Sequence, residues 1–469
     1  MTSETTLHQF LRFLPLLGLA ACAPVGPDYE VPSMNLPASF SQGGVNWKRL
    51  SPDTQPTPQA WWRLYRDSTL NALVERALEN NQDVAASAAR LKQAREMSKA
   101  ARTLYFPDVD LSAGGNRTKS VFRGPTGGSI LYNSFSVPVD LSYELDVWGK
   151  VRRQVESAGA SEDAARETLN ALRLSVAGEV AQTYWALHAV DADRDVLART
   201  LEIRRRALDL LTKRRDAGTI SGLDLARAET EVATAEADRI RLDQDRVELV
   251  NALAVLTGSV ATGSKIPEQT DLPKPPNIPV SVPSELLRQR PDIRAAERRV
   301  AAANADIGVA TAAFYPSVSI GASTGYDAVD VADLFKPDTL VWSLGADAVL
   351  PLTSQKYLRT QRDAAVAAHE AASAEYRQTV LDAIREVENA LQGTAILERR
   401  QVAQDQALAA ARKTFELSVK RFNSGLVSFL DVVDAERTRL EAERNANAIR
   451  AERLALSVSL AKAVGGEWN

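Results

Sequence analysis

Hydrophobic and polar residues alternate from Phe135 to Val147, and the period changes after Gly149. Apolar side chains occupy every second position of the first stretch, which predicts a β-strand with one apolar and one polar face. Farther along, apolar residues recur at steps of three and four, as in the seam of a coiled coil. A strand of about ten residues can cross a bilayer, so the pairing predicts a membrane barrel continued by a long helical tube. The seam residues are Leu169, Leu172, Val176, Val180, Thr183, Leu187 and Val190.

This pattern occurs twice in the chain. The segment 101–107, which ends in Phe-Pro, reappears 209 residues later at 310–316, which ends in Tyr-Pro, and an alternating stretch follows both. The segment 214–229, with its Gly-x-x-x-x-Leu-Asp turn, is echoed 207 residues later by 421–436. Two offsets that differ by two residues indicate a duplication in which each half is helix, hairpin, very long helix, tight turn and long helix.

The duplication gives an expected domain order. Residues 1–21 are a signal peptide, 22–60 an extended segment, 61–257 the first repeat, 258–283 a proline-rich linker and 284–469 the second repeat. In the first repeat we expect a hairpin over 107–148 and long helices over 150–214 and 221–257. In the second we expect a hairpin over 316–351 and long helices over 355–421 and 428–464.

The only cysteine of the chain ends the N-terminal apolar segment. Phe13 to Ala21 is apolar, and Leu-Ala-Ala precedes Cys22, which resembles a bacterial lipoprotein signal cut before an acylated cysteine. The alternative is an ordinary cleaved signal with a stray cysteine. Small residues before the only thiol favour lipidation, and several acyl chains give stable anchoring where one is marginal. Ala23 replaces the aspartate that retains lipoproteins in the inner membrane, which points to the outer membrane.

Strand number requires an oligomer. One chain supplies four strands, which cannot close a barrel, and lipid tolerates no open sheet edges. A homotrimer would give twelve strands, enough to leave a lumen, together with twelve helical columns. The predicted fold class is therefore mainly α with a membrane β-barrel, in which each protomer gives four strands and long coiled-coil helices.

Composition excludes several function classes. The net charge of −4 gives no basic field that would gather nucleic acid. The three histidines, His8, His188 and His369, lie far apart and, with one cysteine, form no metal-ligand pattern. No apolar run reaches the roughly 18 residues of a membrane helix. We expect no enzyme, no cofactor and no metal.

Four sequence features resemble the outer membrane factor family typified by TolC, and within it the lipidated OprM and NodT branch. They are the lipobox ending in Cys22, the segment Ser142–Gly149 (Ser-Tyr-Glu-Leu-Asp-Val-Trp-Gly), Arg-Pro-Asp-Ile at 290–293, and the two turns beginning at Gly218 and Gly425. The resemblance covers nearly all of the mature chain. It implies a trimeric, TolC-like exit duct in the outer membrane of a Gram-negative bacterium, extending into the periplasm. Its implied partners are outer membrane lipids, a periplasmic adaptor and an inner-membrane pump of the RND type.

The same resemblance gives the candidate site at the periplasmic tip. Leu430, Asp431 and Asp434 begin a helix at positions that share a face, and they match the family's apolar plug and acidic aperture rings. The alternative is that these acids only favour a helix N-terminus through the dipole. The turn residues for adaptor contact would be Gly218, Ser221, Gly425 and Ser428. Where TolC has a Tyr and an Arg that lock the turn, this chain has Phe422 and Val427, so its closed state must rest on other contacts.

Three functions fit such a tube. The leading hypothesis is the passive duct of a tripartite efflux pump for small toxic compounds. An exit duct of a type I protein secretion system is the alternative, and the lipobox favours efflux because lipidated members mostly serve proton-driven pumps. A structural lipoprotein or open porin would not need the helical tube.

Overall fold

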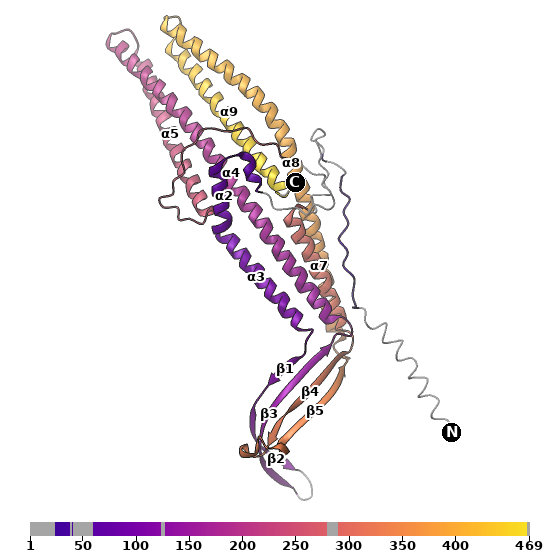
Figure 1. The fold of residues 1–469 in the computed structure, drawn as a ribbon. Coiled ribbons are helices and arrows are strands. Elements are labelled where there is room, and N and C mark those ends of the chain that lie inside the picture. Colours follow the sequence, from indigo (N-terminus) through magenta and orange to yellow (C-terminus); the bar gives the residue numbers. More distant parts are fainter. Residues whose placement is uncertain (1–23, 38–39, 41–59, 123–126, 279–288, 467–469) are drawn as a thin grey trace. The chain divides into compact units, whose positions relative to one another are not determined.

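The computed structural model describes residues 24–37, 40, 60–122, 127–278 and 289–466 (Figure 1). Their contacts divide them into two compact units. The first holds the described residues of Met1–Ser33, Leu91–Arg166 and Ala295–Arg377, and the second holds those of Met34–Arg90, Glu167–Arg294 and Gln378–Asn469. Each predicted repeat contributes one stretch to the first unit and two stretches to the second, so the units do not coincide with the repeats.

The first unit contains an antiparallel sheet with the order β1-β3-β4-β5, and β2 also pairs with β3. Figure 1 shows these strands side by side. The long strand β3 begins at Gly128, earlier than the Phe135 at which the alternation starts, and ends at Leu145, two residues before Val147. Residues 123–126, between β2 and β3 in the sequence, lie outside the described residues. The strands are β1 Asp108–Leu111, β2 Gly114–Phe122, β3 Gly128–Leu145, β4 Ser317–Ala328 and β5 Leu340–Val349.

Proline explains why the first strand is interrupted. Both β1 and β2 pair with β3, and their registers are continuous, with Leu111 opposite Val139 and Gly114 opposite Ser136. The two residues between them face Val137 and Pro138, and Pro138 has no amide hydrogen to donate across the ladder. The amide of Ser112 still donates to Pro138 O at 3.1 Å. β1 and β2 therefore follow one strand path, and the described residues form a sheet of four such paths.

The register gives the sheet one apolar and one polar face. Along one line across three strands, Leu141 pairs with Ala322, which pairs with Leu344. Three positions farther along β3, Glu144 pairs with Ser319, which pairs with Asp347. Because side chains alternate between faces along a strand, the odd-numbered apolar set of β3 shares one face with its apolar partners.

Long helices make up most of the remaining described chain. The helix expected over 150–214 spans Lys150–Asp216, and that expected over 355–421 spans Gln355–Asn423. None of the described helices has the apolar stretch that a membrane crossing demands. The helical elements are η1 Trp61–Tyr65, α2 Ser68–Asn80, α3 Gln82–Thr103, α4 Lys150–Asp216, α5 Gly222–Leu256, α7 Pro291–Ala312, η2 Val331–Asp333, η3 Pro337–Thr339, α8 Gln355–Asn423 and α9 Phe429–Ala463.

An aromatic core holds the second unit. Trp61 and Tyr65 of η1 pack with Trp185 of α4, with ring centroids 6.3 Å apart for Trp61 and Tyr65 and 5.5 Å apart for Tyr65 and Trp185. The hydroxyl of Tyr65 lies 2.6 Å from Ser457 Oγ of α9. Burial raises the pKa of Tyr65 above its usual range. Tyr65 thus joins η1 to α4 and α9.

The Arg-Pro-Asp-Ile motif joins three helices within the second unit. Pro291 is the first residue of α7, where a missing amide hydrogen has no cost. The Arg290 guanidinium donates to Asp292 at 2.6 Å, to Glu386 of α8 at 2.7 Å and to the carbonyl of Ala463 of α9 at 3.0 Å. Burial opposes the charge of Arg290, but these acceptors outweigh it and raise its pKa. The motif is therefore a junction between helix ends.

Candidate functional site

The turns that end α4 and α8 have the same backbone geometry. Gly218 and Gly425 take left-handed φ angles of 72° and 73°. In each turn the glycine amide donates to the carbonyl three residues earlier, and the next amide donates to the carbonyl five residues earlier, at 2.8 to 3.0 Å. This pair of bonds is the Schellman motif, in which glycine is favoured because it lacks the Cβ that disfavours this φ. Two turns 207 residues apart in sequence thus have one geometry.

The helices that leave the two turns are also capped alike. Ser221 Oγ donates to Asp224 Oδ2 at 2.8 Å before α5, and Ser428 Oγ donates to Asp431 Oδ2 at 2.6 Å before α9. The Ser428 amide donates to the same oxygen at 2.8 Å. These bonds from the Ser428 side chain and backbone hold the pKa of Asp431 below its usual range. In one protomer, Asp431 therefore forms a capping box with Ser428 at the start of α9.

The sequence-predicted tip residues lie at the surface of the single chain. Leu430 is 41% exposed, and Asp431 and Asp434 are exposed on the same helix start. The turn residues Gly218, Ser221, Gly425 and Ser428 are exposed as well. The aperture rings and the adaptor contacts involve other chains, so they stay predictions.

The chain has two helical hairpins: α4 and α5 form the first, and α8 and α9 form the second. Their tips, near the two turns, pack against each other. Leu211 and Leu225 of the first hairpin share one buried cluster with Phe429 and Val433 of the second. Phe422 packs against this cluster, with its ring centroid 5.8 Å from that of Phe429. Across the hairpins, the Arg214 guanidinium carbon lies 5.1 Å from the centre of the Phe422 ring, within the range of a cation–π contact. Phe422 therefore joins the hairpins by apolar and cation–π contact.

A buried ion-pair network joins the hairpins farther from the turns. Arg204 of α4 donates through Nη2 to Glu231 Oε2 of α5 at 3.1 Å and to Glu436 Oε2 of α9 at 2.7 Å. Its Nε also donates to Glu436 Oε2, at 2.9 Å, and its Nη1 donates to the Glu231 carbonyl at 2.8 Å. Arg437 pairs with the other carboxylate oxygen of Glu231. Arg204, Glu231 and Glu436 are all buried, so this network is a fixed connection between α4, α5 and α9.

The sequence analysis did not predict this network, although charged residues at apolar seam positions indicate it. Arg204 follows Leu197 and Leu201 at a three-to-four spacing and precedes Leu211 by seven, so it falls on the apolar seam. Glu436 follows Phe429 by seven residues on the seam of α9. A charged residue at a seam position is costly unless it is paired, so opposite charges on two seams indicate a buried pair.

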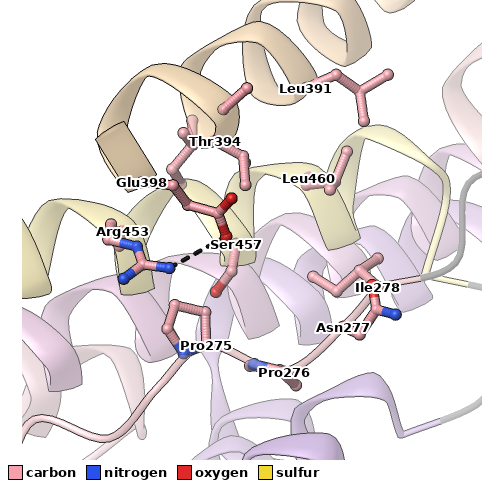
Figure 2. Close-up of a pocket in the computed structure, with 12 residues that line it drawn as sticks. Pro275, Pro276, Asn277, Ile278, Leu391, Thr394, Glu398, Arg453, Ser457 and Leu460 are labelled. Atoms are coloured by element: carbon pink, nitrogen blue, oxygen red, sulfur yellow. Dashed lines mark hydrogen bonds and ion pairs between the residues drawn. The ribbon is translucent and has the colours of Figure 1, made fainter. Parts of the chain in front are cut away.

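A separate pocket lies in the second unit where the proline-rich linker meets α8 and α9. Figure 2 shows Pro275, Pro276 and Ile278 of the linker facing these helices. The cavity has a volume of about 360 Å³, and Arg453 donates to Glu398 at 3.3 Å along its wall. We assign the pocket to packing of the linker against α8 and α9. Among the described residues, no group of His, Cys, Asp or Glu could hold a metal ion.

The predicted acylation site, Cys22, lies outside the described residues. The chain that follows is held in the first unit. The Val25 amide donates to Trp148 O at 3.0 Å, Arg153 donates to Asp28 at 2.9 Å, and Asn304 donates to Pro27 O at 3.0 Å. The segment 24–28 thus runs beside the start of α4 and along α7.

The sequence pattern of a family described as outer membrane efflux protein matches residues 73–259 and 282–466, one range in each predicted repeat. The pyoverdine export outer membrane protein OpmQ of Pseudomonas putida is 32% identical, with 99% of this chain and 98% of that protein covered. The solvent efflux pump outer membrane protein SrpC of Pseudomonas putida is 31% identical, with 98% of both chains covered. Among solved structures, the outer-membrane channel OprN superposes with a TM-score of 0.86 at 30% identity, with 94% of this chain and 99% of that chain covered.

Proposed function

This chain belongs to the outer membrane efflux protein family, and on that premise we propose that it is a passive, gated duct that opens only when partners engage its tip. It is the outer membrane component of an efflux pump and has the TolC-like fold, as the sequence predicts. Its relatives are named for export of solvents and of pyoverdine, which favours efflux of small compounds over protein secretion. A periplasmic adaptor and an inner-membrane transporter, of the RND type, would supply recruitment and energy.

The observation that carries this proposal is the pair of matching hairpin tips joined by the Phe422 contacts and the Arg204 network. The two hairpins of each chain are held together by discrete contacts near the turns, as the closed resting state of a gate requires. In a homotrimer, six such turns would surround the pore, with Leu430, Asp431 and Asp434 as rings. Gly218, Ser221, Gly425 and Ser428 would meet the adaptor at the exposed turns.

The sheet supports the membrane assignment. Three protomers would give a closed barrel of about twelve strands whose apolar face contacts lipid and whose polar face lines the lumen. Closure would remove the free edges of β1, β2 and β5, which lipid does not tolerate.

The lipid anchor is part of the proposal. The segment 24–28 is hydrogen-bonded beside Trp148, which lies three residues after the end of β3. Acyl chains on Cys22 would therefore be attached close to the sheet. Metabolic labelling with a palmitate analogue should mark the wild-type protein and not Cys22→Ser. Label retained in the variant would remove the lipidation claim.

Deleting the gene in its host tests the function. The deletion strain should accumulate a fluorescent efflux dye and become sensitive to small toxic compounds, and the wild-type gene should restore export. The amount of protein that the deletion strain secretes should equal that of the wild-type strain. Unaltered dye export together with loss of a secreted protein would reject the efflux assignment in favour of type I secretion.

A further inference from the structure

Two cations of β2 lie on the apolar face of the sheet, beyond the end of its apolar band. In the register of β2 with β3, Arg117 pairs with Asn133 and Lys119 pairs with Leu131. Paired residues share a face, and positions 131 and 133 continue the odd-numbered set of β3 that carries the alternating apolar side chains. Arg117 and Lys119 therefore lie on the face that contacts lipid in the proposed barrel.

The length of the apolar band gives the depth of these cations in the membrane. The alternating apolar set of β3 runs from Leu145 back to Phe135, which spans about 33 Å along the strand at about 3.3 Å per residue. A strand tilt of about 40° reduces this to about 25 Å, the height of the apolar band of a membrane barrel. Arg117 then lies about 5 Å and Lys119 about 10 Å beyond the band. Head groups occupy roughly 5–8 Å on each side of the hydrocarbon core, so both cations lie at head-group level.

This end of the sheet is the one remote from the helices. β3 ends at Leu145, and α4 begins shortly after it, whereas the pairing of β2 with β3 extends the opposite end (Figure 1). The inference rests on the proposed function, in which the helices extend into the periplasm. The end that carries Arg117 and Lys119 is then in the outer leaflet of the outer membrane.

The described residues do not neutralise the two cations. Arg117 and Lys119 are exposed, and neither forms an ion pair or a side-chain hydrogen bond with a described residue. The aspartates of the connection between β4 and β5 are on the far side of β3, which separates β2 from β4 by about 10 Å. The other residues that share this face of β2 and of β3 from Gly128 to Phe135 are uncharged: Gly115, Val121, Ser129, Leu131, Asn133 and Phe135.

We propose that Arg117 and Lys119 bind the phosphate groups of the phosphorylated glycolipid that forms the outer leaflet of a Gram-negative outer membrane. A charge on the lipid face of a barrel is costly at the midplane and costs little near the interface, so these cations suit a rim position. Arginine binds phosphate through two parallel hydrogen bonds, and lysine binds it as a point charge. The two residues are about 7 Å apart along one strand, which lets them contact one phosphate or two neighbouring phosphates. The acyl chains of the glycolipid would then lie along the apolar band that begins at Phe135.

The binding test uses the purified full-length trimer in detergent and lipid A, the phosphorylated and acylated disaccharide of this glycolipid. Native mass spectrometry should show saturable binding of one lipid A molecule per chain. Lipid A with both phosphates removed has the same acyl chains and should bind at least about tenfold more weakly, because it lacks the charge that the cations attract. Equal binding of the two lipids, or no saturable binding of lipid A, would overturn the proposal.

Variants test whether the position of the charge decides binding. Arg117→Gln combined with Lys119→Gln should lose at least about tenfold in affinity for lipid A. A second variant exchanges neighbours, with Arg117→Thr, Thr118→Arg, Lys119→Ser and Ser120→Lys. It keeps composition and net charge but moves both cations to the polar face, because positions 118 and 120 pair with even-numbered residues of β3. It should lose affinity to the same extent.

The matched control is Lys356→Gln combined with Arg359→Gln. Both are exposed cations at the start of α8, without an ion pair to a described residue, and they should not affect binding. All variants should migrate as trimers with the strand content of the wild type, which separates loss of binding from misfolding. Undiminished binding by the exchange variant, or an equal loss in the control, would reject the site.

A separate measurement keeps this proposal distinct from the proposed function. The wild-type gene is returned to the deletion strain, and dye export is recorded. A wild-type protein that restores export but binds both lipids equally would reject the glycolipid site and leave the duct assignment standing. Failure to restore export would reject the duct assignment, on which the inference rests.

Discussion

Arg204 shows how one side chain joins the two halves of the chain. It is buried with two carboxylates that lie 27 and 232 residues away in sequence. A buried ion pair is not by itself strongly stabilising, but removal of one partner leaves uncompensated charge in a low dielectric. The stability of the hairpin pair should therefore depend on this residue far more than on the exposed ion pairs of the same helices.

We expect Arg204→Met to destabilise the protein by about 3–5 kcal/mol, because Glu231 and Glu436 lose their shared partner. Chemical unfolding followed by far-ultraviolet circular dichroism measures the change. Lys213→Met, which removes an ion pair with Asp209 whose side chains are 72% and 66% exposed, is the control and should cost below about 1 kcal/mol. Equal stability of the two variants would show that the network contributes nothing specific.

At the residue scale, the sequence predicts what local chemistry determines. Gly218 and Gly425 are identified because only glycine readily takes the left-handed φ that ends these helices. The contact between Arg214 and Phe422 is not predictable, because neither residue type requires the other and the two lie in different hairpins. These two residues, 208 positions apart, meet through tertiary packing, which the hydrophobic periodicity of the sequence does not encode.

Elements are predicted well where a single period persists. The alternation before Trp148 identifies β3, and the coiled-coil seam identifies α4, whose Leu169, Val176, Val180 and Leu187 are buried. Strand ends are less predictable. β3 begins at Gly128 because its ladder with β2 starts there, at Phe122 opposite Gly128, in a stretch where apolar side chains do not alternate. Backbone pairing therefore extends the strand beyond the reach of the hydrophobic pattern.

The face assignment of β3 can be tested by single cysteines in the lipid-reconstituted trimer. Asp140, Ser142 and Glu144 variants should react with a water-soluble maleimide, and Leu141, Tyr143 and Leu145 variants should be protected by lipid. The opposite register would place carboxylates in hydrocarbon at several kcal/mol each. Full labelling of all six positions in denaturant is the control. Equal labelling of both sets in the trimer, or the reverse pattern, would contradict the assignment.

At the scale of the whole molecule, the proposed function needs a closed barrel and a ring of carboxylates, and one chain can form neither. A single chain offers four strand paths with free edges and a tip whose Asp431 caps its own helix. Three-fold assembly would turn the same carboxylate into a ring without breaking the cap, because Ser428 and Asp431 belong to one chain. Capping and gating are therefore compatible roles.

Single-channel recording of the purified trimer in planar bilayers tests the gated-duct account most directly. The wild type should conduct poorly, prefer cations and be blocked by multivalent cations from the periplasmic side, because acidic rings attract them. The lowered pKa of Asp431 should keep its charge in mildly acidic buffer. Leu430→Ser should raise conductance while the cation preference persists, because it widens or hydrates an apolar constriction.

The decisive variant is Asp431→Ala combined with Asp434→Ala, compared with Asp224→Ala. The control removes the corresponding cap at the other turn, where Asp224 accepts from Ser221, and should retain blockade. The double variant should lose blockade and much of its cation selectivity. Unchanged blockade in the double variant would mean that these acids only cap α9, and would contradict an aperture at this tip.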